Sequence, residues 1–136
     1  MTLNSILEIW EHPGQGLSVV GLGFRGYAAT CDQHHITASD DEGSGGLRAM
    51  QQALADAGVS YAHVDHINAH ATSTPRGDAA EAAAIARLLR LSDRHAGCDV
   101  SVTSVKGAVG HLLGAAGENA SGRVCISCVA RRSFGV

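Results

Sequence analysis

The sequence predicts an α/β fold in which helices cover a mixed, mainly parallel sheet. Two kinds of segment alternate along the chain: short β-branched runs typical of strands, and longer stretches whose apolar residues recur at helical spacing. Strand, helix, strand, helix, strand, helix is the order typical of parallel strands covered by helices. With 136 residues the chain is long enough for one core, so we expect a single domain over 1–136.

The first half of the chain predicts a strand followed by an amphipathic helix. Residues 17–28 are β-branched and glycine-rich, which favours a strand. After a polar connection, we expect a helix to begin at Ser44 or Gly45 and to end before Gly58, because glycine readily adopts the left-handed conformation just past a helix. The apolar residues expected on one face of this helix are Leu47, Met50 and Leu54.

The second half predicts two more strands, each followed by a helix. The expected strands are residues 63–69 and 98–105. Asp78 and Glu81 have the spacing of a capping box, so we expect them to cap the start of a strongly helix-forming segment. Another helix is expected to begin within 110–116. On the helix after Asp78, one face is expected to hold Ile85, Leu88 and Leu89.

Composition and charge exclude several classes of function. The chain is 45% hydrophobic and 17% charged, and its formal net charge is −3. Its only adjacent basic pair is Arg131-Arg132, so we expect no nucleic-acid partner and no anionic membrane partner. No apolar run is long enough to span a membrane, and the first residues show no targeting signal. We therefore expect a soluble protein of the cytoplasm or of an organelle such as the mitochondrion or plastid.

The four cysteines do not have the spacing of a disulfide framework, so we expect free thiols. Cys125 and Cys128 have CxxC spacing, but no second Cys or His pair stands near them to complete a zinc site. We expect these two residues in a buried strand, as small hydrophobic side chains, and no metal site. A CxxC metal module remains an alternative that a metal assay would test.

Two stretches that follow predicted strands carry candidate site residues. Loops at the ends of parallel strands present side chains into one crevice, and residues 68–75 and 105–111 both occupy that position. His111 is expected in the first turn of a helix, where the dipole disfavours protonation. Two neutral histidines, His70 and His111, could then donate hydrogen bonds to a developing oxyanion or enolate oxygen. The other histidines are expected in surface or loop roles: His12, His34, His35, His63, His66 and His95.

Two segments closely resemble the C-terminal signature segments of the β-ketoacyl-acyl carrier protein synthases, the elongating condensing enzymes of fatty-acid synthesis. They are HINAHATSTPRGDAAEAAAI (66–85) and SVTSVKGAVGHLLGAAG (101–117). A weaker similarity covers 26–117, and the tail at 118–136 diverges. The resemblance implies a thiolase-like C-terminal half-domain, shortened at its C-terminal end. The domain over 1–136 would thus be a partial one.

The resemblance also implies the chemistry. His70 and His111 would be the histidines of a Cys-His-His site that Lys106 supports, and Thr72 and Thr74 would line the tunnel for a phosphopantetheine arm. The reaction would be a decarboxylative Claisen condensation of an acyl thioester with a malonyl thioester. The resemblance implies no cofactor beyond the phosphopantetheine of the acyl carrier protein. Its partners would be that carrier protein and a second copy of the enzyme.

The sequence departs from the family pattern at the nucleophile. The family's reactive cysteine lies in an N-terminal half, and none of Cys31, Cys98, Cys125 and Cys128 stands in its motif. A thiolate cannot be replaced by histidines and a lysine, so we do not expect complete condensation by this chain alone. Decarboxylation of a malonyl thioester remains the activity to test. The alternative is a non-catalytic fragment or splice variant that binds carrier protein or a full-length subunit.

Overall fold

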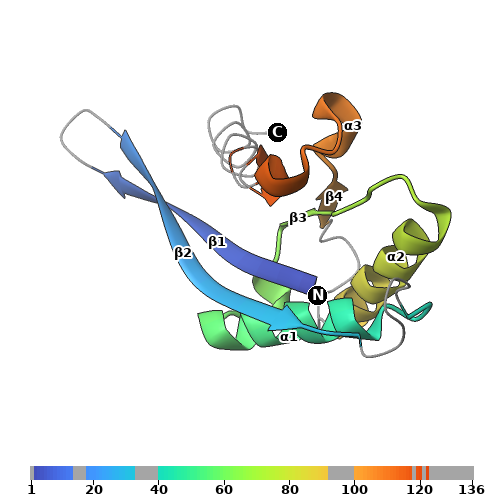
Figure 1. Ribbon diagram of the computed structural model, residues 1–136. Helices are drawn as coiled ribbons and strands as arrows, with labels where there is room; N and C mark the ends of the chain where they lie inside the picture. The colour runs from blue at the N-terminus through green and yellow to red at the C-terminus, as the bar shows by residue number, and fades with distance from the viewer. Residues whose placement is uncertain are drawn as a thin grey trace.

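The computed structural model describes residues 2–13, 18–32, 40–91, 100–117, 119–120 and 122. Along the chain (Figure 1), the strands and α-helices are β1 (Thr2–Pro13), β2 (Ser18–Thr30), α1 (Ser44–Ala57), β3 (His66–Asn68), α2 (Pro75–Arg90), β4 (Ser101–Thr103) and α3 (Lys106–Val109). Two short 3-10 helices are Tyr61–His63 and Leu113–Ala115. The strands predicted at 17–28, 63–69 and 98–105 and the helix from Ser44 are confirmed, the second and third strands being shorter than expected.

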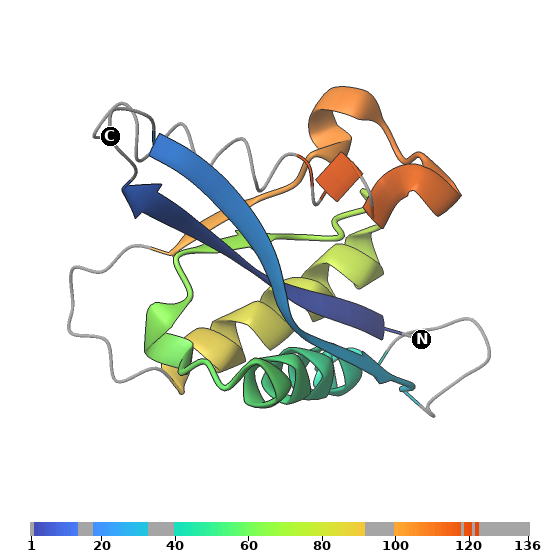
Figure 2. The ribbon, with the colours of Figure 1, turned by 90° about the vertical axis from the view of Figure 1, so that its left-hand side faces the viewer.

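The described strands form two separate two-stranded sheets. β3 and β4 are parallel, with His66 opposite Ser101 and Asn68 opposite Thr103. β1 and β2 form a long antiparallel hairpin, which lies against α1 (Figures 1 and 2). β1 was not among the predicted strands. The parallel pair with its helices has the predicted α/β character, and it is this pair that positions the candidate site.

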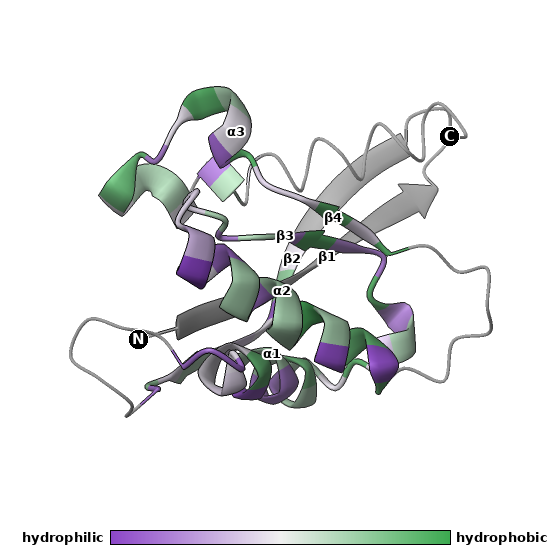
Figure 3. Ribbon diagram, turned by 90° about the vertical axis from the view of Figure 1, so that its right-hand side faces the viewer, coloured by the Kyte–Doolittle hydropathy of each residue, from purple (hydrophilic) through white to green (hydrophobic). Residues whose placement is uncertain are grey.

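The core lies where α1 and α2 pack against each other. Its buried cluster consists of Leu47 and Leu54 from α1 and Ala84 and Leu88 from α2. Partly buried side chains packed against it include Met50 and Ile67, the second of which comes from β3. The predicted apolar face of α1 is therefore confirmed. On α2, Ile85 and Leu88 are buried as predicted, whereas Leu89 is only partly buried and lies outside the cluster. In Figure 3, hydrophobic and hydrophilic residues alternate along both helix ribbons, as expected of half-buried helices.

Close approach of backbones requires glycine at two positions. A Cβ atom on Gly26 of β2 would lie 2.5 Å from the carbonyl oxygen of Ala53 in α1. Gly43, just before α1, has a φ of +64°, and a Cβ there would meet the carbonyl oxygen of Ala80 in α2. At the other end of α1, Gly58 also has a φ of +64° and ends the helix where the sequence predicted.

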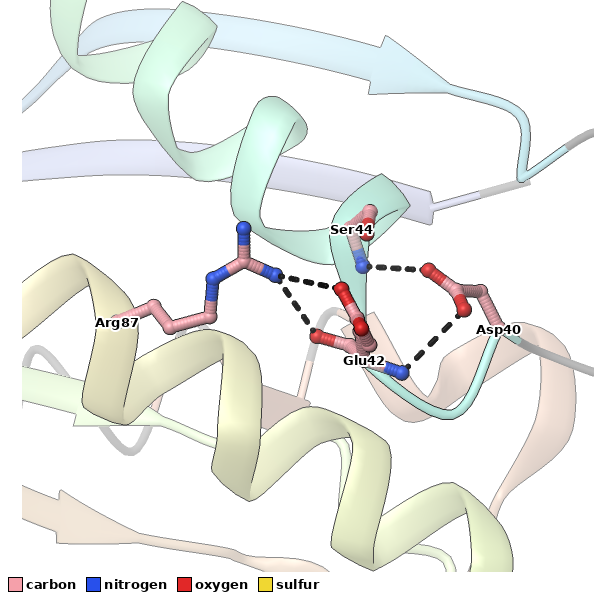
Figure 4. Close-up of polar contacts among 4 residues, drawn as sticks. All are labelled: Asp40, Glu42, Ser44 and Arg87. Atoms are coloured by element: carbon pink, nitrogen blue, oxygen red, sulfur yellow. Dashed lines mark hydrogen bonds and ion pairs between the residues drawn. The ribbon is translucent and has the colours of Figure 1, made fainter.

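The start of α1 is fastened by polar contacts (Figure 4). The Asp40 carboxylate accepts hydrogen bonds from the backbone N–H groups of Glu42, at 3.3 Å, and Ser44, at 3.2 Å. Arg87 of α2 donates to the backbone carbonyl of Glu42 at 3.2 Å. A second arginine of α2, Arg76, pairs with the Asp41 carboxylate. These contacts hold the segment before α1 against α2.

The structure corrects the predicted capping box. α2 begins at Pro75, with Thr74 at the N-cap, so Asp78 lies inside the first turn and does not cap the helix. Proline has the fixed φ that suits a first helical residue, and this starts the helix four residues earlier than the Asp78 pattern indicated. Glu81 does not reach back to a capping residue either. Its carboxylate contacts the loop that holds His70.

A helix does begin within 110–116 as predicted, since Leu113–Ala115 form a 3-10 helix and Ala116 and Gly117 are α-helical, but the predicted place of His111 in its first turn is wrong. α3 ends at Val109, and Gly110 follows with a φ of +77°. A 3-10 helix then starts at Leu113. His111 therefore lies between two short helical segments and not in the first turn of an α-helix. The left-handed glycine interrupts the helix there, so the dipole argument for a neutral His111 does not hold.

None of the helices in the described ranges combines the length and apolar character needed to cross a bilayer.

Candidate functional site

The parallel pairing of β3 and β4 places the two site-bearing loops side by side. Beyond the strand ends, the N–H of Ala69 donates to the carbonyl of Thr103 at 2.6 Å, which extends the ladder by one step. The side-chain oxygen of Asn68 accepts a hydrogen bond from the N–H of Val105 at 3.4 Å. The first contact joins the loop after β3 to the end of β4, and the second joins the end of β3 to the N-cap of α3. They lie immediately before His70 and Lys106.

His70 and His111 come together at this edge of the sheet. Their ring centroids are 5.6 Å apart and the rings are nearly perpendicular, at 85°. The backbone N–H of Leu113 donates to Nδ1 of His111 at 3.3 Å. A nitrogen that accepts a hydrogen bond carries no proton, so a neutral His111 has its proton on Nε2. That nitrogen is then available as a donor to a ligand.

Burial and the surrounding charges have opposing effects on the pKa of His70. Partial burial of its ring, followed by the nearby Lys106 ammonium, lowers the pKa of His70 below its ordinary value of 6.5. The carboxylates of Glu81 and Asp78 act in the opposite direction, and His111 adds a smaller lowering effect. The imidazole of His70 is therefore neutral at pH 7. Lys106, placed at the first position of α3, acts on this ring through its charge.

Glu81 fixes the backbone of the loop that carries His70. Its two carboxylate oxygens accept from the N–H of His70, at 2.7 Å, and from the N–H of Ala71, at 2.8 Å. Ala71 has a φ of +32° and Ser73 a φ of +65°, which are left-handed conformations that non-glycine residues rarely adopt. Two charge-assisted hydrogen bonds help to hold this strained turn.

A pocket of about 280 Å³ opens beside His70. Thr72 and Thr74 line it, and their hydroxyl oxygens are 3.2 Å apart. Its charged lining groups are the carboxylates of Asp32, Asp78 and Glu81. Lys106 and His111 are not among the described residues that line this pocket, but both act on His70, which does line it. Of the sequence-predicted residues, His70, Thr72 and Thr74 thus share the pocket, and Lys106 and His111 are linked to it through His70.

Two polar residues of the pocket were not singled out from the sequence. Asn68 ends β3, and its side-chain Nδ2 is buried without a hydrogen-bond partner among the described residues. Asp32 follows β2 and lines the pocket from the opposite segment of the chain. The signal for Asn68 is a polar side chain at the last position of a short buried-type strand. Asp32 had no comparable signal, because it is far from His70 in sequence.

The described residues include one cysteine and no cluster of metal ligands. Cys31 is exposed and free, and it is the one cysteine in the described part of the chain. Cys98, Cys125 and Cys128 lie outside the described residues, and so does the strand expected around the last two. Among the described residues, no group of three potential His, Cys, Asp or Glu ligands comes together as a metal site.

Exposed apolar side chains lie around the site and on the hairpin. Near His111 they include Val109, Leu112 and Leu113, the last of which is 77% exposed. On β2, Phe24 is 66% and Tyr27 is 51% exposed. Large exposed apolar side chains in such number are typical of surfaces that contact another protein segment.

Comparison with known proteins places the chain in the β-ketoacyl synthase family. Residues 23–129 match the family model described as beta-ketoacyl synthase, C-terminal domain. The 3-oxoacyl-[acyl-carrier-protein] synthase, mitochondrial, of Arabidopsis thaliana is 42% identical over 112 residues, which cover 82% of this chain and 24% of the relative. The 3-oxoacyl-[acyl-carrier-protein] synthase 2 of Vibrio cholerae is 42% identical over 113 residues, 83% of this chain and 27% of the relative.

A solved structure shows the same backbone arrangement. It contains a type II polyketide acyl-carrier protein in complex with its ketosynthase bound to the hexaketide, and the matched chain is 29% identical to this one. The TM-score is 0.62, and the match covers 76% of this chain and 26% of the other. This chain therefore spans about a quarter of the length of the proteins it matches.

Proposed function

The chain belongs to the β-ketoacyl synthase family as a C-terminal domain, and we propose that it supplies the histidine half of the active site of a 3-oxoacyl-[acyl-carrier-protein] synthase of fatty-acid biosynthesis. The expected thiolase-like α/β fold is confirmed by this membership. The observation that carries the proposal is the His70–His111 pair, 5.6 Å apart at the edge of a parallel sheet. The condensation itself is proposed for an enzyme of which this chain is a part.

In the proposed reaction a cysteine thiolate, supplied outside the histidine half, first takes the acyl group as a thioester. The malonyl thioester then loses carbon dioxide, and the electron pair of the broken carbon–carbon bond forms an enolate. The enolate carbon attacks the acyl thioester carbonyl, a new carbon–carbon bond forms, and the cysteine leaves as a thiolate. Neutral His70, together with His111, donates hydrogen bonds to the thioester oxygen on which the enolate charge develops.

The remaining predicted residues have supporting roles in this proposal. After burial of the ring, the Lys106 ammonium is the second cause that lowers the pKa of His70, which favours a histidine that donates without titrating at pH 7. Glu81 holds the His70 loop through two backbone hydrogen bonds. Thr72 and Thr74, on the wall of the 280 Å³ pocket, contact the phosphopantetheine arm that delivers the malonyl group.

The proposed partners are an acyl carrier protein and a second synthase subunit. The similar ketosynthase of known structure, solved in complex with its acyl-carrier protein, supports the carrier as the substrate-bearing partner. No cofactor is needed beyond the carrier's phosphopantetheine. Relatives named mitochondrial occur in Arabidopsis thaliana and Schizosaccharomyces pombe, and others are bacterial, which supports a location in the cytoplasm or in an organelle.

The test measures decarboxylation, because this step does not require the acylated cysteine. We expect the 136-residue chain to release carbon dioxide from malonyl-acyl carrier protein. His70→Ala and His111→Ala should each lower the rate about a hundredfold, the usual effect of removing one preorganised donor. His63→Ala is the matched control, because His63 is exposed in a 3-10 helix outside the site, and it should leave the rate unchanged. Release no faster than that of His70→Ala would overturn the histidine mechanism for this chain.

A second candidate function is a non-catalytic subunit that binds a longer synthase chain or carrier protein. The exposed Phe24, Tyr27 and Leu113 favour it, because they offer apolar surface to a partner. The two candidates differ in what the purified chain does alone. The first predicts turnover, and the second predicts association without turnover.

A further inference from the structure

A second pocket lies between α1 and α2 and shares no lining residue with the pocket beside His70. Its volume is about 500 Å³. Three arginines line it: Arg48 from α1, and Arg87 and Arg90 from α2. None of its lining residues in the described part of the chain is acidic, whereas three carboxylates line the pocket beside His70. The two pockets therefore have opposite electrostatic character.

This concentration of positive charge is unusual for the chain. Its formal net charge is −3, and the described residues include six lysines and arginines, three of which line this one pocket. The rest are Arg25, Arg76 and Lys106. Placing like charges together costs Coulomb energy. An anion bound among the three arginines relieves this repulsion, and it is attracted more strongly than it would be by a single exposed arginine.

The guanidinium groups keep donors free for a ligand. Arg48 donates once, to the carbonyl of Cys31 at 3.0 Å. Arg87 reaches across from α2 to Glu42, with 3.2 Å to the backbone oxygen and 3.8 Å to the carboxylate (Figure 4). Arg90 has no hydrogen-bond or ion-pair partner among the described residues. Each guanidinium has five N–H donors, so most of them are unused.

From these contacts we propose that the pocket binds a phosphate group carried on a small organic molecule. Guanidinium groups match phosphate oxygens through paired, charge-assisted hydrogen bonds, and a phosphate dianion can use more than one arginine. Leu47 and Leu91 add apolar lining, which suits the organic part of such a ligand. Ser44 supplies a hydroxyl at the same wall. The assignment does not depend on the condensing activity.

The experiment titrates the full chain with three probes at low salt and follows backbone amide resonances by NMR. Phenyl phosphate joins a phosphate to an apolar ring, benzoate presents a carboxylate on the same ring, and inorganic phosphate lacks the ring. We expect saturable binding of phenyl phosphate, with the largest shifts at the α1 and α2 residues of the pocket. Binding of inorganic phosphate with equal affinity would also support the site and would identify the free ion as its ligand. Benzoate binding as tight as phenyl phosphate overturns the phosphate assignment.

Three variants localise the site. Arg90→Gln and Arg48→Gln should each weaken phenyl phosphate binding about tenfold, the usual effect of losing one charge-assisted contact. Arg76→Gln is the matched control, because Arg76 lies on the same helix but is paired with Asp41 outside the pocket, and it should bind as the wild type does. No saturable shift, or an equal loss in Arg76→Gln and Arg90→Gln, overturns the proposal.

Discussion

The surroundings of His70 determine the protonation state of its imidazole. Burial and Lys106 favour its neutral form, and these effects exceed the opposing effects of Glu81 and Asp78. A histidine kept neutral by its surroundings can donate one hydrogen bond without repelling the adjacent Lys106. The sequence predicted a neutral imidazole at His111, from a helix dipole, and indicated no group that would keep His70 neutral. The structure gives that role to burial and to the lysine.

The lowered pKa of His70 makes stability depend on pH with a definite sign. In the unfolded chain this histidine takes up its proton near its ordinary pKa of 6.5, whereas the folded chain does so only at lower pH. As pH falls below 6.5 the unfolded state binds more protons, so the folded state loses stability until pH passes the folded pKa. We expect this loss to be smaller in His70→Gln. Urea unfolding of both chains from about pH 8 to about pH 5 measures the difference.

An NMR titration of the histidine ring protons separates this effect from the carboxylates. His70 should titrate below 6.5 in the wild type, and Lys106→Met should raise its midpoint, because one of the two main causes is removed. Equal midpoints in the two chains would contradict the role assigned to Lys106.

The packing of β2 on α1 depends on the absence of a side chain at Gly26. A Cβ there would lie 2.5 Å from the oxygen of Ala53 and 2.6 Å from the nitrogen of Ala57. Both are helix backbone atoms, which cannot move aside separately. Gly26→Ala should therefore lower the free energy of unfolding by about 1–3 kcal/mol, as overpacking commonly does. Chemical denaturation of the purified variant measures this loss.

Gly46→Ala is the matched control within the same helix layer. A Cβ at Gly46 would be 3.6 Å from the Cβ of Ala84, an ordinary contact, and alanine suits a helix better than glycine. We expect this variant to be as stable as the wild type or more so. If Gly26→Ala were equally well tolerated, β2 would not lie on α1 as closely as the structure has it.

Most elements could be predicted from the sequence because their signals are local. The apolar face of α1 and the glycine after its last residue are such signals, and both are confirmed. β1 could not be predicted in this way. Its residues Leu3, Ile6, Leu7 and Trp10 recur at helical spacing. Pairing with β2, a non-local interaction, gives the segment its strand structure.

The site residues that follow a strand end could be predicted from the sequence. The contact that a side chain of α2 makes with a distant loop could not. His70 and Lys106 follow β3 and β4 directly, so the parallel pairing brings them to one edge. The Asp78 and Glu81 pattern failed because Pro75 sets the helix start. Glu81 then binds the N–H groups of His70 and Ala71, a contact between residues that capping rules do not consider.

At the scale of the whole molecule, the short length of the chain and its exposed apolar surface both bear on whether it associates with another chain. The chain spans about a quarter of its curated relatives' length. Its α1–α2 core is built largely from alanine and leucine and is small. Meanwhile Phe24, Tyr27 and Val102 are each about half or more exposed. Apolar surface left in water favours contact with another chain, at roughly 25 cal/mol for each Å² removed.

We therefore expect the purified chain to self-associate as its concentration rises. Light scattering coupled to size-exclusion chromatography measures the mass across a wide concentration range. The double variant Phe24→Ser and Tyr27→Ser should shift the distribution toward monomer, because it removes aromatic surface without touching the His70 edge. Arg25→Ser, between the two aromatics on β2, controls for substitution of the strand itself. A wild-type chain that stays monomeric throughout, with a single sharp unfolding transition, would mean that this surface needs no partner, and the non-catalytic subunit would lose its main support.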